Sequence, residues 1–93
     1  MTKVLHAQIT GRVQGVGYRI WAARAAERLS LAGWVRNRRD GSVEAVFKGD
    51  EDAVVRMLDE CWRGPRGAKV DNVVATAIAD EGWSEFAVRS TAD

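Results

Sequence analysis

The spacing of hydrophobic residues alternates along this chain between the period of a strand and the period of a helix, and no other feature constrains the fold as strongly. Leu5, Ala7 and Ile9 alternate with polar residues, which is typical of a half-buried strand. Over residues 18–29 the apolar side chains recur every three or four positions, which predicts an amphipathic helix with one buried stripe. Gly33 follows this helix, and we expect it to form the left-handed C-terminal cap.

The middle of the chain predicts a hairpin followed by a second helix. Residues 34–37 and 43–48 have strand patterns, and Asp40-Gly41 between them is a strong turn signal. A helix is predicted over residues 51–62, with Asp50 as its N-cap. Its expected apolar face consists of Val54, Val55, Leu58, Cys61 and Trp62.

Two further strands are predicted, over residues 70–78 and, more briefly, over 86–88. Two strand–helix–strand units around a hairpin indicate the ferredoxin-like split β-α-β arrangement. This is an α+β sandwich with an antiparallel sheet and two helices on one face. Since the chain has 93 residues and no linker or repeat, we expect a single domain over residues 1–93, with its core at about 4–90.

The composition argues against a disordered protein, a membrane protein and a protein held together by disulfides or zinc. The hydrophobic share of 46% and the charged share of 29% are those of a globular protein rather than a disordered one. No apolar run is long enough to span a membrane and the start lacks a signal-peptide core, so we expect a cytoplasmic protein without a membrane partner. The single cysteine, Cys61, rules out an intrachain disulfide and a cysteine cluster for zinc.

The net charge of +1 conceals an uneven distribution. Residues 1–49 have a net charge of +6 and residues 50–93 a net charge of −5. This asymmetry is consistent with an anion-binding region in the first half of the chain. It is equally consistent with a fold in which the basic first half and the acidic second half pack together. We expect Arg36, Arg38 and Arg39 to form a solvated basic sheet edge. A nucleic-acid partner is not expected, because the strand that would stack bases has one aromatic residue, Phe47, on its core side.

The loop between the first strand and the first helix has the residues of an anion site. Gly15 and Gly17 allow consecutive N–H groups to converge, and the following helix N-terminus adds further donors. Arg19 at the junction has a planar guanidinium that suits two phosphate oxygens. From these residues alone, a glycine-rich turn followed by a surface arginine is the commoner explanation, and the Gly-Lys-Ser/Thr of a nucleotide P-loop is absent.

Two blocks of the sequence match a known family. GRVQGVGYR at residues 11–19 closely resembles the signature loop of the acylphosphatases, which hydrolyse carboxyl–phosphate anhydrides. GWVRN at 33–37, followed by DGSVE at 40–44, resembles the second signature, and weaker similarity runs from about residue 5 to 89. The resemblance implies a ferredoxin-like sandwich, a small-molecule acyl phosphate substrate and no cofactor or metal. The apolar pattern requires no partner chain, so we expect a monomer.

The resemblance also implies roles for individual residues. The catalytic arginine corresponds to Arg19, which would bind the phosphoryl group, and the catalytic asparagine to Asn37, which would orient the attacking water. The remaining phosphate-binding positions would act through their backbone: Gln14, Gly15, Val16, Gly17 and Tyr18. Position 17 is commonly bulkier in the family, so Gly17 is a mild departure.

The expected reaction is hydrolysis of small acyl phosphates to a carboxylate and inorganic phosphate. A carboxylate leaves readily, so the protein needs mainly to position water and to stabilise charge on the phosphoryl oxygens. A phosphate- or acyl-phosphate-binding module without turnover is the main alternative, and an oligonucleotide-binding protein is a more distant one. The only histidine, His6, has the parity of a polar strand residue and is expected to be exposed or hydrogen-bonded there, not to be a catalytic base.

Overall fold

The computed structural model describes residues 1–92 and contains the predicted order of elements. In chain order these are β1 (Thr2–Arg12), α1 (Tyr18–Arg28), β2 (Ala32–Asn37), β3 (Val43–Asp50), α2 (Glu51–Arg63), β4 (Lys69–Ala77) and β5 (Phe86–Val88). The strands form one sheet in the order β4-β1-β3-β2-β5. The predicted α+β ferredoxin-like sandwich is therefore confirmed.

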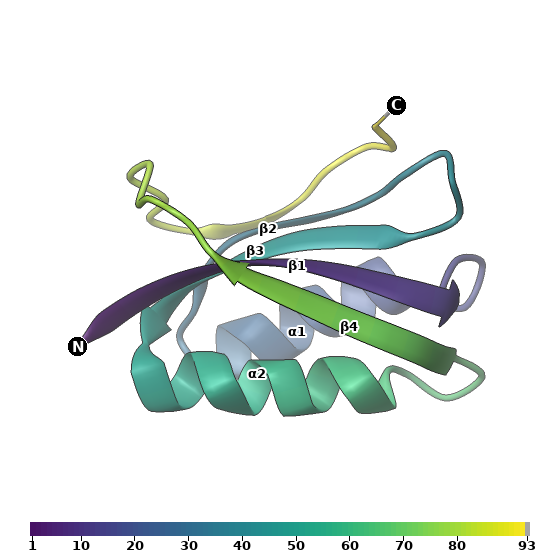
Figure 1. Ribbon diagram of the computed structural model, residues 1–93, viewed down its shortest axis with the longest axis horizontal. Helices are drawn as coiled ribbons and strands as arrows, with labels where there is room; N and C mark the ends of the chain where they lie inside the picture. Colours follow the sequence, from purple (N-terminus) through teal and green to yellow (C-terminus); the bar gives the residue numbers. More distant parts are fainter. Residues whose placement is uncertain (93) are drawn as a thin grey trace.

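Both helices cover the same face of the sheet, as Figure 1 shows. Neighbouring strands are antiparallel except at one edge, where β5 runs parallel to β2. Alternate residues of β1 face the helices, and Ala7 and Ile9 are fully buried there. Phe47 is also fully buried and stacks on Phe86 of β5 at a centroid distance of 5.7 Å. Its predicted place in the core is confirmed.

The first helix ends earlier than predicted, and Gly33 is not its cap. α1 ends at Arg28, and Ser30, with a φ of 58°, takes the left-handed conformation instead. Gly33 lies inside β2 with a φ of 129°. A Cβ placed on it would lie 1.9 Å from the Val46 carbonyl oxygen of β3. This glycine therefore allows two strand backbones to approach closely.

The buried face of the second helix is rotated from the predicted one. Its fully buried residues are Val54, Met57 and Cys61, spaced as one helical stripe. Val55 and Trp62 flank this stripe and are about half exposed, so their predicted burial is wrong. Asp50 is at the N-cap as predicted, but its side chain makes no capping hydrogen bond.

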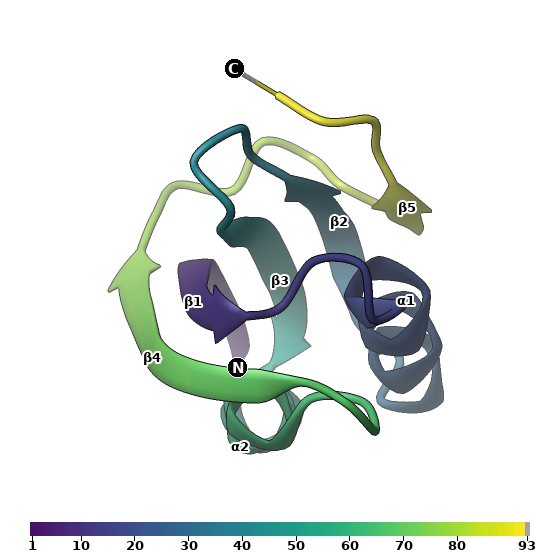
Figure 2. The ribbon, with the colours of Figure 1, turned by 90° about the vertical axis from the view of Figure 1, so that its right-hand side faces the viewer.

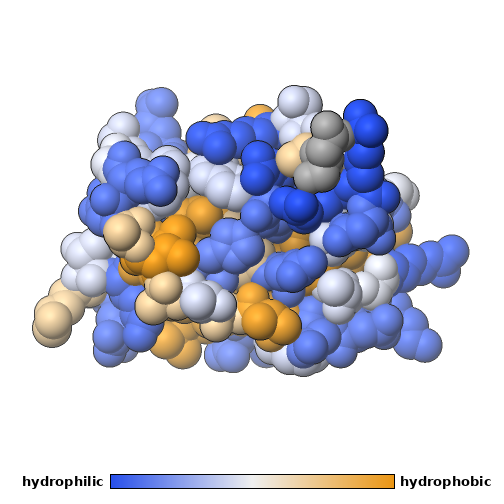
Figure 3. Space-filling model, turned by 45° about the horizontal axis from the view of Figure 1, so that its top comes forward, coloured by the Kyte–Doolittle hydropathy of each residue, from blue (hydrophilic) through white to orange (hydrophobic). Residues whose placement is uncertain are grey.

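The sheet face opposite the helices combines a small apolar cluster of Val4, Trp34 and Val46 with polar and charged residues. Figure 3 shows separate, small apolar patches among hydrophilic residues. The predicted basic edge is wrong, because β5 lies outside β2 and forms the edge. Arg36 and Arg38 instead bind Glu44 of β3 through Nε–Oε1 and Nη1–Oε1 contacts of 2.7 and 3.1 Å. His6 is 2.6 Å from the other Glu44 oxygen and is thus a hydrogen-bonded strand residue, as predicted. No helix within residues 1–92 has the length and apolarity to span a membrane.

Glu44 should make the stability of the protein depend on pH. Burial raises the pKa of its carboxyl, but hydrogen bonds from His6, Arg36 and Arg38 outweigh this and lower the pKa to about 2. A folded-state pKa below the unfolded value means that the stabilisation is complete above pH ~4.5 and is lost as the pH falls towards 2. We expect Glu44→Gln to lower the free energy of unfolding by about 1–2 kcal/mol at pH 7. Denaturant titrations at pH 7 and pH 2.5 should show that difference shrinking in acid, and an unchanged difference would contradict this role of the carboxylate.

Candidate active site

The loop between β1 and α1 has a backbone that favours glycine at two positions. Gly15 and Gly17 have φ values of 74° and 78°, both left-handed. A Cβ on either would meet no atom within 4 Å, so the backbone conformation and not a lack of space favours glycine. Gly17 is also the N-cap of α1. The first turn of a helix leaves N–H groups without partners in the helix, and here these donors adjoin the loop.

A pocket of about 160 Å³ lies at this junction. It is lined by Val13, Gln14, Gly15, Gly17, Tyr18, Arg19, Ile20 and Asn37. The structure thus brings together the loop, the predicted arginine and the predicted asparagine, which lie on separate elements. Figure 2 views this end of the molecule, where the loop from β1 to α1 passes close to the end of β2. Of the predicted phosphate-binding residues, only Val16 does not line the pocket, and its side chain packs on the core.

Arg19 is connected to the segment that follows β5. Its Nη1 donates to the Arg89 carbonyl oxygen at 3.0 Å. This carbonyl is itself fixed, because the Arg89 amide donates to the Val35 carbonyl and its guanidinium lies 4.8 Å from the Trp34 ring centroid. A guanidinium has five N–H donors, so this one contact leaves others available for an anion.

Asn37 is the last residue of β2 and presents a buried acceptor. Its side-chain oxygen, Oδ1, has no hydrogen-bond partner among the described residues. A buried polar atom without a partner is rare in proteins, and it is most often explained by a ligand, an ordered water or a functional role. The backbone carbonyl of Asn37 accepts from the Ala92 amide at 2.9 Å, which fixes the main chain beside the pocket. Asn37 thus lines the pocket with a side chain whose acceptor oxygen no described group occupies.

Two of the predicted phosphate-binding residues have side-chain contacts that the sequence did not indicate. Gln14 was expected to act through its backbone, but its Nε2 donates to the carbonyls of Arg38 and Ser42 at 2.7 and 2.8 Å. The Tyr18 hydroxyl donates to the Cys61 carbonyl at 2.7 Å, which ties the start of α1 to α2. Burial raises the pKa of Tyr18 well above its ordinary value, so the phenol stays neutral and is no acid–base group at neutral pH.

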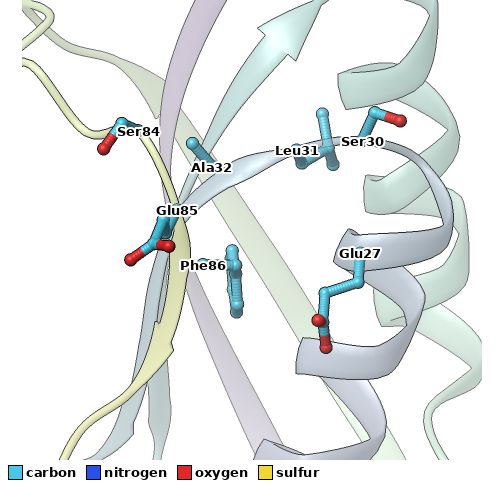
Figure 4. Close-up of a pocket in the computed structure, with 7 residues that line it drawn as sticks. All are labelled: Glu27, Ser30, Leu31, Ala32, Ser84, Glu85 and Phe86. Atoms are coloured by element: carbon cyan, nitrogen blue, oxygen red, sulfur yellow. The ribbon is translucent and has the colours of Figure 1, made fainter.

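A larger hollow of about 510 Å³ lies at the other end of α1. Figure 4 shows it between the last turns of that helix and the strand that contains Phe86. Glu27 lines it, and Glu85 lies beside it with its carboxylate turned outwards. Negative charge at this position would repel an anionic ligand, and none of the predicted site residues lines this hollow. The pocket beside Arg19 is the better anion site despite its smaller volume.

Comparison with known proteins agrees with the resemblance found in the two signature blocks. The family model for acylphosphatase matches residues 5–88. An acylphosphatase of Rhodopseudomonas palustris is 58% identical over 72 residues, which cover 77% of this chain and 73% of the relative. One from Azorhizobium caulinodans is 49% identical over 92 residues, covering 98% of this chain and 99% of the relative.

A solved structure extends this agreement to three dimensions. The acylphosphatase from Coxiella burnetii superposes with a TM-score of 0.92 at 39% identity, over 95% of this chain and 93% of the other. Its agreement in fold complements the sequence matches, which span the segments that form the pocket. This chain belongs to the acylphosphatase family.

Proposed function

We propose that the acylphosphatase activity of this chain resides in the pocket that holds Arg19 and Asn37. The reaction is the hydrolysis of the carboxyl–phosphate bond of a small acyl phosphate to a carboxylate and inorganic phosphate. The observation that most supports this site is the buried, unpartnered Oδ1 of Asn37 beside the glycine-rich loop and Arg19. These groups supply the two functions that the reaction needs, an anion cradle and an acceptor for water.

The phosphoryl group would bind at the loop. Backbone N–H groups of residues 14–18 and the partial positive charge of the α1 N-terminus favour a dianionic group there. Arg19 would add two parallel N–H···O bonds from its guanidinium, since its hydrogen bond to the Arg89 carbonyl uses only one donor. Because these donors are fixed before the substrate binds, they need little rearrangement as charge shifts on the phosphoryl oxygens.

Asn37 would orient the attacking water. Its Oδ1 accepts a hydrogen bond from the water while its Nδ2 remains available as a donor, which a neutral amide can do without titrating. The water oxygen forms a bond to phosphorus, the bond from phosphorus to the carboxylate oxygen breaks, and the carboxylate leaves with the electron pair. The proton of the water passes to a phosphoryl oxygen. A stable carboxylate leaving group explains why the reaction can proceed without a strong acid or a metal ion.

Turnover of a panel of acyl phosphates, with benzoyl phosphate as the reference, tests this function. We expect hydrolysis that persists in EDTA, with inorganic phosphate as a competitive inhibitor. Inhibition should be competitive because the product occupies the same loop as the phosphoryl group of the substrate. Binding of acyl phosphate without turnover would favour the binding-module alternative, and salt-dependent RNA binding without hydrolysis would favour an oligonucleotide-binding protein.

We further infer that the chain acts as a cytoplasmic monomer that folds as one domain. The larger of two core clusters includes residues from Leu5 of β1 to Cys61 of α2, and the smaller one, of Val4, Trp34 and Val46, lies on strands of the same sheet, which supports one folding unit. Large exposed hydrophobic side chains such as Ile20, Val55 and Val74 belong to different elements, which supports a monomer. Light scattering should then report a species of 10.2 kDa, and a stable dimer mass would contradict the inference.

A further inference from the structure

We infer that the side chain of Gln14 is a positioning residue, which sets the distance between the phosphate loop and Asn37. The inference rests on the proposed function, because it concerns the alignment of the two halves of the same site. It assigns to Gln14 a role for its side-chain amide, in addition to the backbone role that the family resemblance implies.

The two halves of the site belong to different parts of the sheet. The phosphate loop follows β1, whereas Asn37 ends β2 and is followed by the turn of residues 38–42. β1 and β3 pair up to Ile9 and Val43, and past this point β1 keeps only its pairing with β4 on the other side. The loop therefore begins where β1 has already separated from the hairpin that holds Asn37.

Gln14 spans this separation with two hydrogen bonds. Its Nε2 donates to the Arg38 carbonyl at 2.7 Å and to the Ser42 carbonyl at 2.8 Å. A primary amide has two N–H groups, so both are used, and two acceptors fix the direction of the side chain better than one. The Arg38 amide also donates to the Ser42 carbonyl at 2.9 Å, so both acceptors belong to the closed base of the hairpin turn.

Arg38, whose carbonyl accepts one of the two hydrogen bonds, directly follows Asn37 in the chain. A change in the Gln14 contacts therefore shifts the loop relative to Asn37 with no intervening flexible segment. In-line attack needs the water oxygen within about 3–3.5 Å of phosphorus, and a displacement of about 1 Å can cost on the order of 10²-fold in rate. The phosphate donors themselves lie in the loop and in α1, so phosphate affinity depends much less on this alignment.

The test separates alignment from binding. In Gln14→Leu the side chain keeps a similar volume but loses both donors. We expect kcat for benzoyl phosphate to fall about 10- to 100-fold, while the inhibition constant of inorganic phosphate changes less than about threefold. Equal loss of kcat and of phosphate affinity would show that Gln14 only keeps the loop folded, and would overturn the inference, as would unchanged kcat.

Lys48→Met is the matched control. Lys48 also donates to a backbone carbonyl of a distant segment, that of Trp83 at 3.0 Å, and its Nζ lies 2.9 Å from the Asp80 carboxylate. None of these residues lines the pocket, so kcat should stay within about twofold even if the melting temperature falls as far as in Gln14→Leu. A loss of kcat in both variants would mean that any broken cross-link slows the enzyme, which would contradict a specific role for Gln14.

Failure of the positioning role of Gln14 can be distinguished from failure of the proposed function. If the unmodified chain shows no turnover, the proposed site chemistry fails whatever Gln14 does. If the unmodified chain turns over benzoyl phosphate and Gln14→Leu matches it, only the positioning role is wrong.

Discussion

Replacing Arg19 with alanine is expected to lower kcat/KM for benzoyl phosphate by at least about 10²–10³-fold, because the phosphoryl oxygens lose a preorganised, charged donor. The fold should survive the change. The contact of Arg19 with the Arg89 carbonyl is at the surface, so the free energy of unfolding should fall by no more than about 1 kcal/mol. Steady-state kinetics and a denaturant titration of the same sample check both parts.

Two further substitutions make the Arg19 prediction specific. Arg19→Lys keeps the charge but loses the planar fork, so it should recover only part of the lost rate. Arg24→Ala removes an exposed arginine from the same helix without touching the pocket, and kcat/KM should remain within about twofold of the unmodified chain. Activity of Arg19→Ala within tenfold of the unmodified chain would remove Arg19 from the proposed chemistry.

Replacing Asn37 with alanine is expected to lower kcat by about 10²–10³-fold, because the water loses the group that orients it. Phosphate affinity should change little, since the loop and Arg19 remain. The free energy of unfolding should stay within about 1 kcal/mol of the unmodified value, because Oδ1 has no partner in the described part of the protein to lose. A large activity loss without a stability loss is the signature of a residue kept for function.

A charge substitution at the same position gives an independent check. Asn37→Asp keeps an acceptor oxygen but replaces the amide donor and brings a negative charge close to the phosphoryl group. We therefore expect it to lose activity and also to bind inorganic phosphate more weakly than Asn37→Ala. Near-normal turnover in either variant would contradict the assignment of water orientation to Asn37.

The order of elements could be predicted because burial on one face imposes a hydrophobic period that the residues themselves display. The parts of the fold that depend on backbone geometry could not be predicted in this way. Gly33 looked like a helix cap, since the sequence does not reveal that two strands approach closely at that residue. Val55 and Trp62 looked buried because residues flanking a helical stripe are also apolar, whereas Met57 completes the actual buried face.

The candidate site also contains residues that the sequence predicts and contacts that it does not. Its glycines and Arg19 indicate an anion loop from their chemistry alone, but the commoner explanation could be set aside only with the family resemblance. That resemblance also supplied Asn37, whose buried Oδ1 is a property of the packing. The Gln14 contacts were missed because their acceptors are backbone carbonyls, which every residue has. The pairing of Arg36 and Arg38 with Glu44 was missed because it depends on the register of β2 with β3, which places Arg36 opposite Glu44 and which a turn signal alone does not set.

Hydrolysis of benzoyl phosphate in ¹⁸O-labelled water shows which atom the water attacks. If the loop and Arg19 hold the phosphoryl group while Asn37 directs water at phosphorus, the label should appear in inorganic phosphate and not in benzoate at the rate of the enzymatic reaction. This incorporation should be lost in Arg19→Ala and Asn37→Ala. Label in the benzoate carboxyl group would show attack at the acyl carbon and would contradict the proposed site chemistry.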